Sequence, residues 1–450
     1  MSSDTRIHSS ARTIASRLIG ATLLIMGCLA FATTAGALTL VVDDDGQGTD
    51  TDCNALTPCF LTISAAVLAA SAGDIIVVCP GTYAENVTIN KQLTLQGAQS
   101  GVAGCGRVVG APNPAVESIL SGPAPGPTLI TLVSGSAGTI VDGFSFIGAT
   151  RCLESATGPI NNVIIRNNHF AGFTGSGIFL NDPGVDVTVD QNNVDGSSKT
   201  GGNSIHLDTD LFNGFHLTRN CIVNAAAGPG FFVDGAHNVG PSGRPPLIDG
   251  NRFEGSVTNV GANLGSRAFG GGTISNNIFR NNGFDGLQGG IQNTTINGNL
   301  FDNNGRWGLA LTAFGNLAVD RGGQNCIVTG NTFTANDSAG YFISATQAPG
   351  NAASNSLNNN DLVNNGPGAG LGFGAIYRGT ETIDVECNWW GHANGPDYVP
   401  ANPNPPADGL FGTSALYSPW LNGSITGTPQ CELPTPAERS TWGTLKTRYR

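Results

Sequence analysis

One six-residue pattern recurs along the chain: an aliphatic residue, two others, an asparagine, one further residue and an apolar residue. The first copy runs from Ile165 to Phe170 and the last from Val385 to Trp390. The asparagines of the nine copies are Asn168, Asn192, Asn220, Asn251, Asn277, Asn299, Asn331, Asn360 and Asn388. Their spacing of 22 to 32 residues fits one coil of a β-solenoid whose loops vary in length. We therefore expect each copy to mark one rung.

The apolar positions and the asparagine of this repeat have different predicted roles. The apolar positions alternate as in a strand with one buried face, whereas asparagine tolerates the left-handed backbone of a tight bend. Rungs of a parallel sheet stack about 4.8 Å apart, so the amides are expected to hydrogen-bond along the axis as a ladder. A row of asparagine ligands for a sugar is the alternative interpretation, but bend formation explains every copy.

Apolar runs outside the repeat predict the remaining elements. Residues 74–83, 87–89, 93–97 and 140–147 are predicted strands. Residues 63–70 have apolar residues at helical spacing, with Thr62 as a possible N-cap and Gly73 as a stop, and this helix is expected to cover the first coil. We predict an N-terminal cap and first strand over residues 38–86, the solenoid over 87–390, an irregular C-terminal cap over 391–431 and a tail over 432–450.

The N-terminal 37 residues have the features of a signal peptide. Three arginines precede the apolar run from Leu18 to Phe31, and Ala35-Gly36-Ala37 is a sequence that a signal peptidase accepts. An alternative is lipoprotein processing before Cys28, for which Met26 is poorly suited. No other stretch approaches the roughly 18 to 20 apolar residues of a membrane span. The protein is therefore expected to be secreted or at the cell surface, with no membrane span.

Cysteine content agrees with an oxidising compartment. Removing Cys28 with the signal peptide leaves nine of the ten cysteines, so one thiol is expected to stay unpaired. Cys53 and Cys59 flank a short loop and form the best local pair, and Cys79 with Cys105 is a second candidate pair. The other partners cannot be read from spacing.

The charge balance limits the class of ligand. The chain has 20 Lys and Arg against 32 Asp and Glu; the signal peptide holds three Arg and one Asp, which leaves 17 against 31, a net charge near −14. This argues against a nucleic-acid partner. It also disfavours acidic polysaccharides unless a metal ion bridges the like charges.

Two blocks towards the ends of the chain resemble a known family. They include Pro80 to Tyr83 and Lys91 to Leu95 near the N-terminus, and Asn388 to Gly391 and Tyr417 to Leu421 near the C-terminus. Together with the repeat, they resemble the bacterial right-handed parallel β-helix repeat proteins of the pectin-lyase-fold superfamily. The resemblance implies an all-β, right-handed parallel β-helix with a short N-terminal capping helix and an irregular C-terminal cap. It implies no particular reaction, because the fold hosts lyases, hydrolases, esterases, epimerases and noncatalytic surface proteins.

Aligning three consecutive coils on the repeat brings candidate site residues together. The strands 177–181, 204–208 and 230–234 then place Ile178, Ile205 and Phe231 inward with Leu180, Leu207 and Val233. The outward residues are Phe179, His206 and Phe232, followed by Asn181, Asp208 and Asp234, with Asp210 just beyond. We expect an aromatic platform for a sugar ring beside a group of carboxylates.

Carboxylates on adjacent rungs would lie about 5 Å apart, close enough to raise one another's pKa or to share a Ca²⁺ ion. Asp208 and Asp234, with His206, are therefore candidate catalytic residues, and Arg219 is the nearest candidate base for a lyase. The alternative is that both aspartates simply end strands and begin turns. Asp43, Asp45 and Asp50 form a second acidic cluster that resembles a Ca²⁺ loop in residue type but not in spacing, and its alternative is a solvated turn.

Of two function classes, we favour the noncatalytic one. It is an exported or surface protein, expected to be a monomer, that binds extracellular polysaccharide through an elongated groove and requires no cofactor. The alternative is a polysaccharide-degrading glycoside hydrolase or lyase that uses the paired carboxylates, with Ca²⁺ as a possible ligand. The sequence signatures of polygalacturonases, pectin methylesterases and mannuronan epimerases are absent.

Overall fold

The computed structural model describes residues 36–44, 59–107, 112–122, 126, 128–181, 184–207, 213–233, 243–265, 269–312, 322–344, 354–366, 372–379, 381–398, 403, 407–412 and 414–432. All described coils belong to one compact unit, Ala37–Arg450. Most of the predicted signal peptide and the whole of the tail from residue 433 lie outside the described residues. Within the described ranges, no helix has the length and apolar character needed to cross a membrane.

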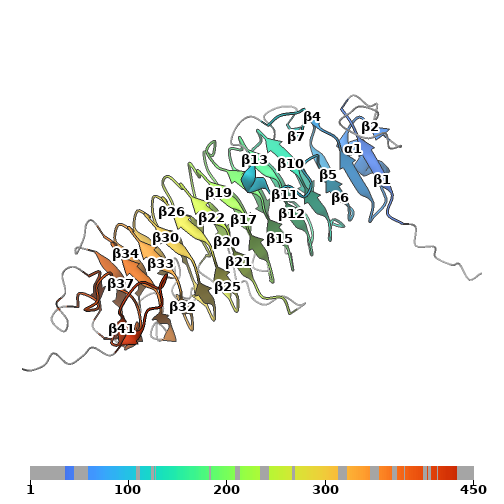
Figure 1. Ribbon diagram of the computed structural model, residues 1–450. Helices are drawn as coiled ribbons and strands as arrows, with labels where there is room; N and C mark the ends of the chain where they lie inside the picture. Colours follow the sequence, from blue (N-terminus) through green and yellow to red (C-terminus); the bar gives the residue numbers. More distant parts are fainter. Residues whose placement is uncertain are drawn as a thin grey trace, which may run out of the picture. The chain divides into compact units, whose positions relative to one another are not determined.

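Three long parallel sheets, here called A, B and C, make up the stack (Figure 1). In spatial order, sheet A consists of β2 (Cys59–Phe60), β1 (Thr39–Val42), β3 (Ile75–Val78), β6 (Thr94–Gln96), β9 (Ile140–Asp142), β12 (Ile164–Arg166), β15 (Thr188–Asp190), β18 (His216–Thr218), β21 (Leu247–Asp249), β25 (Thr273–Ser275), β29 (Thr295–Asn297), β32 (Ile327–Thr329), β35 (Ser356–Asn358), β38 (Ile383–Asp384) and β40 (Ala415–Leu416). Sheet B consists of β4 (Gly81–Ala84), β7 (Ser118–Ser121), β10 (Phe144–Ile147), β13 (His169–Ala171), β16 (Asn193–Asp195), β19 (Cys221–Val223), β22 (Arg252–Glu254), β26 (Ile278–Arg280), β30 (Leu300–Asp302), β33 (Thr332–Thr334) and β36 (Asp361–Val363). Sheet C consists of β5 (Val87–Ile89), β8 (Thr128–Leu132), β11 (Arg151–Ser155), β14 (Ser176–Leu180), β17 (Ile205–Leu207), β20 (Phe231–Val233), β23 (Ala262–Asn263), β27 (Leu287–Gly289), β31 (Trp307–Leu311), β34 (Ala339–Ser344), β37 (Phe373–Arg378) and β39 (Gly409–Phe411).

From β3 to β37 the chain passes through sheets A, B and C in turn. Two short pairs complete the strands: β24 (Phe269–Gly270) lies parallel to β28 (Ile291–Gln292), and β41 (Trp420–Leu421) lies antiparallel to β42 (Cys431–Glu432). Each of the first eight six-residue repeats joins the end of a sheet A strand to a sheet B strand across a tight bend, as in β12 and β13. Equivalent repeat positions pair in register, for example Ile165 with Val189. The all-β parallel β-helix predicted from the repeat is confirmed.

The repeat asparagines form a continuous buried ladder at the bend between sheets A and B. The nine side chains are at most 1% exposed. Asn277 is typical: its Nδ2 donates to Oδ1 of Asn299 at 2.9 Å and to the carbonyl oxygen of Ile248 at 2.9 Å. Its own Oδ1 accepts from the backbone N and from Nδ2 of Asn251. Every polar atom of the amide is therefore satisfied without water, as a buried amide requires.

The predicted position of the left-handed bend residue was wrong by one residue. The residue before each ladder asparagine, not the asparagine itself, has positive φ, as at Asn167 (56°), Arg219 (54°) and Gly250 (66°). The asparagine instead turns its amide inward to the neighbouring coils. A left-handed residue bends the chain, and the ladder amide then bonds the coils above and below it.

A second buried ladder, which the sequence did not reveal, lies at the bend between sheets B and C. It consists of Asn282, Asn304, Asn336 and Asn365, each donating Nδ2 to the next Oδ1 at 2.8 to 2.9 Å. Asp408 ends this ladder, and its Oδ2 accepts from Asn365 Nδ2 at 2.7 Å. Burial raises the pKa of Asp408 to about 7, against the hydrogen bonds from Asn365 that favour the charged form.

We expect Asp408→Asn to remove a pH dependence of stability. The folded pKa of about 7 exceeds the ordinary value of 3.8, so the native state holds a proton that the unfolded chain has lost between these pH values. The protonated Asp408 carboxyl therefore makes its full contribution to the free energy of unfolding below pH 4. This contribution falls as pH rises towards 7, by up to about 4 kcal/mol. Urea unfolding of the unaltered protein and of Asp408→Asn from pH 4 to 8 measures the free energy of unfolding against pH. The same pH dependence in both proteins would contradict the prediction.

The interior and the N-terminal end are closed by apolar packing. Phe253, Phe279, Phe301 and Phe333 stack inside with ring centroids 4.8 to 4.9 Å apart. The predicted capping helix is confirmed as α1 (Ile63–Ala69), whose Thr62 N-cap hydroxyl accepts from the backbone N of Ala65. Ile63, Ala66 and Val67 bury its inner face.

Disulfides join parts of the chain that the sequence did not pair. Cys105 bonds Cys221 and Cys387 bonds Cys431, so the predicted Cys79–Cys105 pair is wrong. The reason is the path of residues 97–107, which cross several coils before the chain enters β7. Cys53 lies outside the described residues, so its predicted bond to Cys59 stays a prediction.

Candidate functional site

The outer face of sheet C holds the predicted aromatic residues. Phe179, His206 and Phe232 pair in register on β14, β17 and β20. Their neighbours point inward as predicted: Ile178, Leu180, Ile205, Leu207, Phe231 and Val233 all belong to the core. The period-two alternation of strands puts the two sets on opposite faces.

These three rings form a stack that we call the His206 stack. The imidazole of His206 lies 4.9 Å from the ring of Phe179 and 4.9 Å from that of Phe232, nearly perpendicular to both, at 87° and 78°. The guanidinium of Arg151 covers Phe179 at 3.7 Å and pairs with Glu154 at 2.8 Å. Edge-to-face contacts of this kind and the cation above the ring fix the three rings along the axis.

The predicted polar residues beside this stack are only partly described. Asn181 follows β14, is exposed, and donates its backbone N to Ser155 Oγ at 2.8 Å. Asp208, Asp210 and Asp234 lie outside the described residues. The residues just before two of them, Leu207 and Val233, pair in register on adjacent strands. The close approach of the Asp208 and Asp234 carboxylates therefore stays a prediction.

A second aromatic group lies further along the same face. The indole of Trp307 stacks on Phe342 of the next coil, with centroids 3.7 Å apart and planes within 2°. Ala310, Ala339 and Ile376 pack with them in a cluster separate from the core. We call Arg306, Trp307 and Phe342 the Trp307 stack.

A buried ion pair holds this second stack in place. Arg306 donates Nε and Nη2 to the two oxygens of Asp285 at 2.8 and 2.6 Å, and its guanidinium lies 4.0 Å from the Trp307 ring. Asp285 is fully buried, and burial raises its pKa while Arg306 opposes that shift. The Phe284 side chain is 45% exposed, and the guanidinium carbon of Arg306 lies 5.5 Å from the centroid of its ring. An exposed ring thus lies beside a fixed guanidinium.

Sequence reasoning missed the Trp307 stack although a signal was present. Extending the three-coil alignment along the ladder asparagines places Gln288, Ala310 and Phe342 in the same outward column as Phe232. Trp307 pairs with Ala339, three residues before that column. The stacking of Trp307 on Phe342 depends on side-chain packing, which the alignment does not contain.

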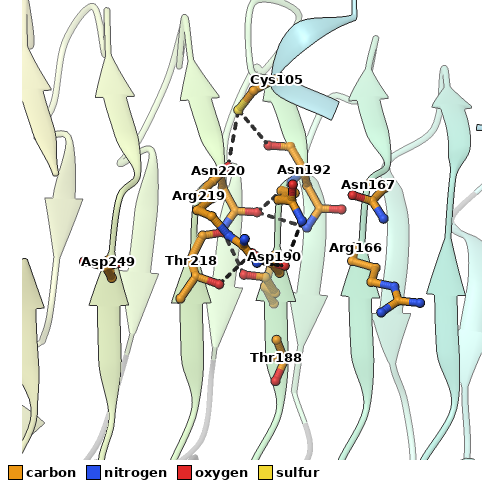
Figure 2. Close-up of polar contacts among 12 residues, drawn as sticks. Cys105, Arg166, Asn167, Thr188, Asp190, Asn192, Thr218, Arg219, Asn220 and Asp249 are labelled. Atoms are coloured by element: carbon orange, nitrogen blue, oxygen red, sulfur yellow. Dashed lines mark hydrogen bonds and ion pairs between the residues drawn. The ribbon is translucent and has the colours of Figure 1, made fainter. Parts of the chain in front are cut away.

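Sheet A carries the best-defined carboxylates, and they are already occupied. Figure 2 shows Asp190 beside Thr218 and Arg219 of the next coil; its oxygens accept from Thr218 Oγ1 at 2.7 Å and from Arg219 Nε and Nη2 at 2.9 and 2.5 Å. Asp142 is likewise paired with Arg166 at 2.9 Å. Arg219, the nearest candidate base for a lyase, lies at the bend after sheet A with its guanidinium on Asp190.

A lysine near β17 has an altered pKa but no access to ligand. Burial lowers the pKa of Lys199 to about 7, and its Nζ donates to the carbonyl oxygen of Pro229 at 2.9 Å and contacts Ser204 Oγ at 3.3 Å. Lys199 is 4% exposed and Ser204 is fully buried. The amine therefore joins loops of neighbouring coils and offers no nucleophile to a substrate on the face.

The predicted Ca²⁺ cluster has only one described member of the three. Asp43 is 2% exposed and follows β1, whereas Asp45 and Asp50 lie outside the described residues. Among the residues that the structure describes, no group of three or more His, Cys, Asp or Glu side chains is placed to hold a metal ion. The calcium site therefore stays a prediction.

Comparison with known proteins identifies the fold. Residues 211–389 match the family model described as "Right handed beta helix region". The matched residues, from β18 to β38, lie within the parallel β-helix that the structure describes. A comparison with curated protein sequences found no match.

Solved β-helix structures are similar to this β-helix at low sequence identity. The A-module of the Azotobacter vinelandii mannuronan C-5 epimerase AlgE4 is 14% identical, over 67% of this chain and 88% of that one, with a TM-score of 0.44. The Dettilon tailspike protein (gp208) is 13% identical, over 83% and 68%, with a TM-score of 0.43. DFA-IIIase from Arthrobacter chlorophenolicus A6 is 12% identical, over 83% and 93%, with a TM-score of 0.40.

Proposed function

We propose that this β-helix protein is exported and binds extracellular polysaccharide along the outer face of sheet C. The observation that carries the proposal is the pair of aromatic stacks on that face. Between them, Asn263 and Gln288 occupy the same outward column. Aromatic rings can pack on the C–H faces of sugars, while amides and guanidinium groups can hydrogen-bond to hydroxyl groups. The two stacks and the two amides between them, here called the strip, therefore combine both kinds of contact that a sugar chain needs.

The other two faces lack such a strip in the part of the chain that the structure describes. On sheet A, the outward rings of the described coils comprise only His216, and the carboxylates of Asp142 and Asp190 are paired with arginines. On sheet B, His169 is the outward ring of the central coils, between Ser145 and Asn193 of the neighbouring strands. Sheet C is therefore the face that we assign to the ligand.

The length of the strip favours a polymer. From Phe179 to Phe342 the column runs through His206, Phe232, Asn263, Gln288 and Ala310, which is six steps between strands. At about 4.8 Å per step this is roughly 29 Å. A single sugar would contact one or two rungs, whereas an extended chain would contact both stacks.

We expect the protein to bind one or more members of a panel of neutral and acidic polysaccharides. Phe232→Ala and Trp307→Ala should each weaken binding about tenfold, because each removes one ring worth about 1–2 kcal/mol in a ligand contact. Affinity electrophoresis, with and without Ca²⁺, measures this. His216→Ala on sheet A is the matched control and should bind as the unaltered protein does.

The enzyme alternative is tested in the same panel. Reducing ends and unsaturated products are followed together with binding. Turnover that is lost in Asp208→Ala and Asp234→Ala would replace the noncatalytic proposal by a hydrolase or lyase. Binding that His216→Ala weakens as much as Trp307→Ala would contradict the assignment to sheet C.

A further inference from the structure

One bend between sheets A and B differs from those that follow it. In later coils one or two residues separate the strands, such as Asn167 and Asn168 between β12 and β13. After β6 the chain instead leaves the coil and does not enter sheet B until β7 begins at Ser118. Its described first part, residues 97–107 with the short 3₁₀ turn η1 (Gly104–Gly106), is here called the strap.

The strap crosses the bends of the next four coils. Ser100 Oγ donates to Asp142 Oδ2 at 2.9 Å, and the backbone N of Gly104 donates to the carbonyl oxygen of Gln191 at 2.7 Å. A Cβ on Gly104 would lie 2.4 Å from the carbonyl oxygen of Asn168, so only glycine allows this approach. Figure 2 shows Cys105 beside Asn192 and Asn220 of the ladder, and its Sγ is bonded to Cys221.

A polar row lies beneath the strap on the outer face of sheet B. Ser145, His169 and Asn193 pair in register on β10, β13 and β16 and are 0, 4 and 4% exposed. Arg107 of the strap donates Nη1 to Ser145 Oγ at 3.4 Å and to the carbonyl oxygen of Phe144 at 3.3 Å. Burial, followed by the charge of Arg107, lowers the pKa of His169. The strap therefore seals this row from water.

The described strap has polar contacts and one covalent bond, but no large apolar anchor. Val102, its one large aliphatic side chain, is 49% exposed. Hydrogen bonds to the bends compete with water, and segments without buried apolar side chains open most readily. The disulfide is thus the strongest tie between the strap and the coils.

We propose that the strap is a redox-gated cover. With the Cys105–Cys221 bond formed it seals the polar row, and with the bond reduced it detaches while the coils stay stacked. Reduction takes two electrons and two protons from a dithiol, which gives two cysteine thiols and the cyclic disulfide of the reductant. Both cysteines are partly exposed and can meet a dithiol, whereas the thiols of Cys152 and Cys326 are buried. The cover would stay open in a reducing cytoplasm and close after export.

Hydrogen–deuterium exchange of the folded protein, with and without dithiothreitol, tests the gate. We expect amides of the strap to exchange at least tenfold faster after reduction, and those of β26, β30 and β33 to be unchanged. Diethyl pyrocarbonate should modify His169 only after reduction, while His216 reacts in both states. Cys105→Ser with Cys221→Ser should behave as the reduced protein, and Cys387→Ser with Cys431→Ser is the matched control that leaves the strap closed.

Two results would overturn the proposal. One is that the strap amides exchange at an unchanged rate and His169 stays unmodified, although alkylation shows that Cys105 and Cys221 are reduced. The other is faster exchange of β26, β30 and β33 in parallel with the strap, because the disulfide would then hold the stack rather than its cover. Reduction of the folded, unaltered protein keeps the test decisive if the double serine variant does not fold.

Discussion

Asn277→Ala is expected to lower the free energy of unfolding by about 3 to 5 kcal/mol. The change leaves the backbone N–H and one amide hydrogen of Asn251 without an acceptor, and both are buried. Each unsatisfied buried group costs about 1–3 kcal/mol. Urea unfolding, followed by circular dichroism, measures the loss.

Asn303→Gly is the control for this ladder prediction. Asn303 also bonds an asparagine of the neighbouring coil, with Nδ2 donating to Asn281 Oδ1 at 2.8 Å, but this pair is exposed. Its φ of 52° suits glycine, so the change should cost less than about 1 kcal/mol. Equal losses in Asn277→Ala and Asn303→Gly would show that burial of the ladder does not contribute to stability.

Phe279→Ala is expected to destabilise the protein by about 3 to 5 kcal/mol, through lost apolar contact and the cavity left behind. The Phe279 ring is fully buried between Phe253 and Phe301, at 4.8 and 4.9 Å. Because backbone bonds fix the spacing of the coils, the neighbouring rings cannot close the gap. The shift of the urea midpoint measures this effect.

Phe284→Ala provides the comparison, since Phe284 lies five residues further on and is 45% exposed. It should shift the midpoint only slightly and leave the slope of the transition unchanged. A destabilisation by Phe279→Ala no larger than that by Phe284→Ala would contradict the assignment of the stacked rings as the core of the coils.

The sequence predicted the coils well because the information is local to each strand. Alternation of apolar and polar residues decides which side chain faces inward, and the ladder asparagines supply the alignment. Those two facts correctly placed Phe179, His206 and Phe232 on one outer column. The second ladder was missed because its asparagines occur in only four described coils and fall outside the six-residue pattern.

What failed depends on contacts between distant segments. The partner of Cys105 follows from the path of the strap across several bends, which no spacing of cysteines encodes. The position of Arg219, the nearest candidate base in the alignment, also depends on the bend, which turns its guanidinium towards Asp190. The Trp307 stack likewise depends on an indole filling the space beside small alanines.

The ligand is proposed to lie on the outer face of sheet C, and hydroxyl-radical footprinting tests this position most directly. The protein is oxidised with and without the polysaccharide that the panel identifies, and modified side chains are located by mass spectrometry. We predict protection of His206, Phe232 and Trp307 together, with His216 on sheet A unchanged. Protection of His216 with none at His206, Phe232 or Trp307 would contradict the claim.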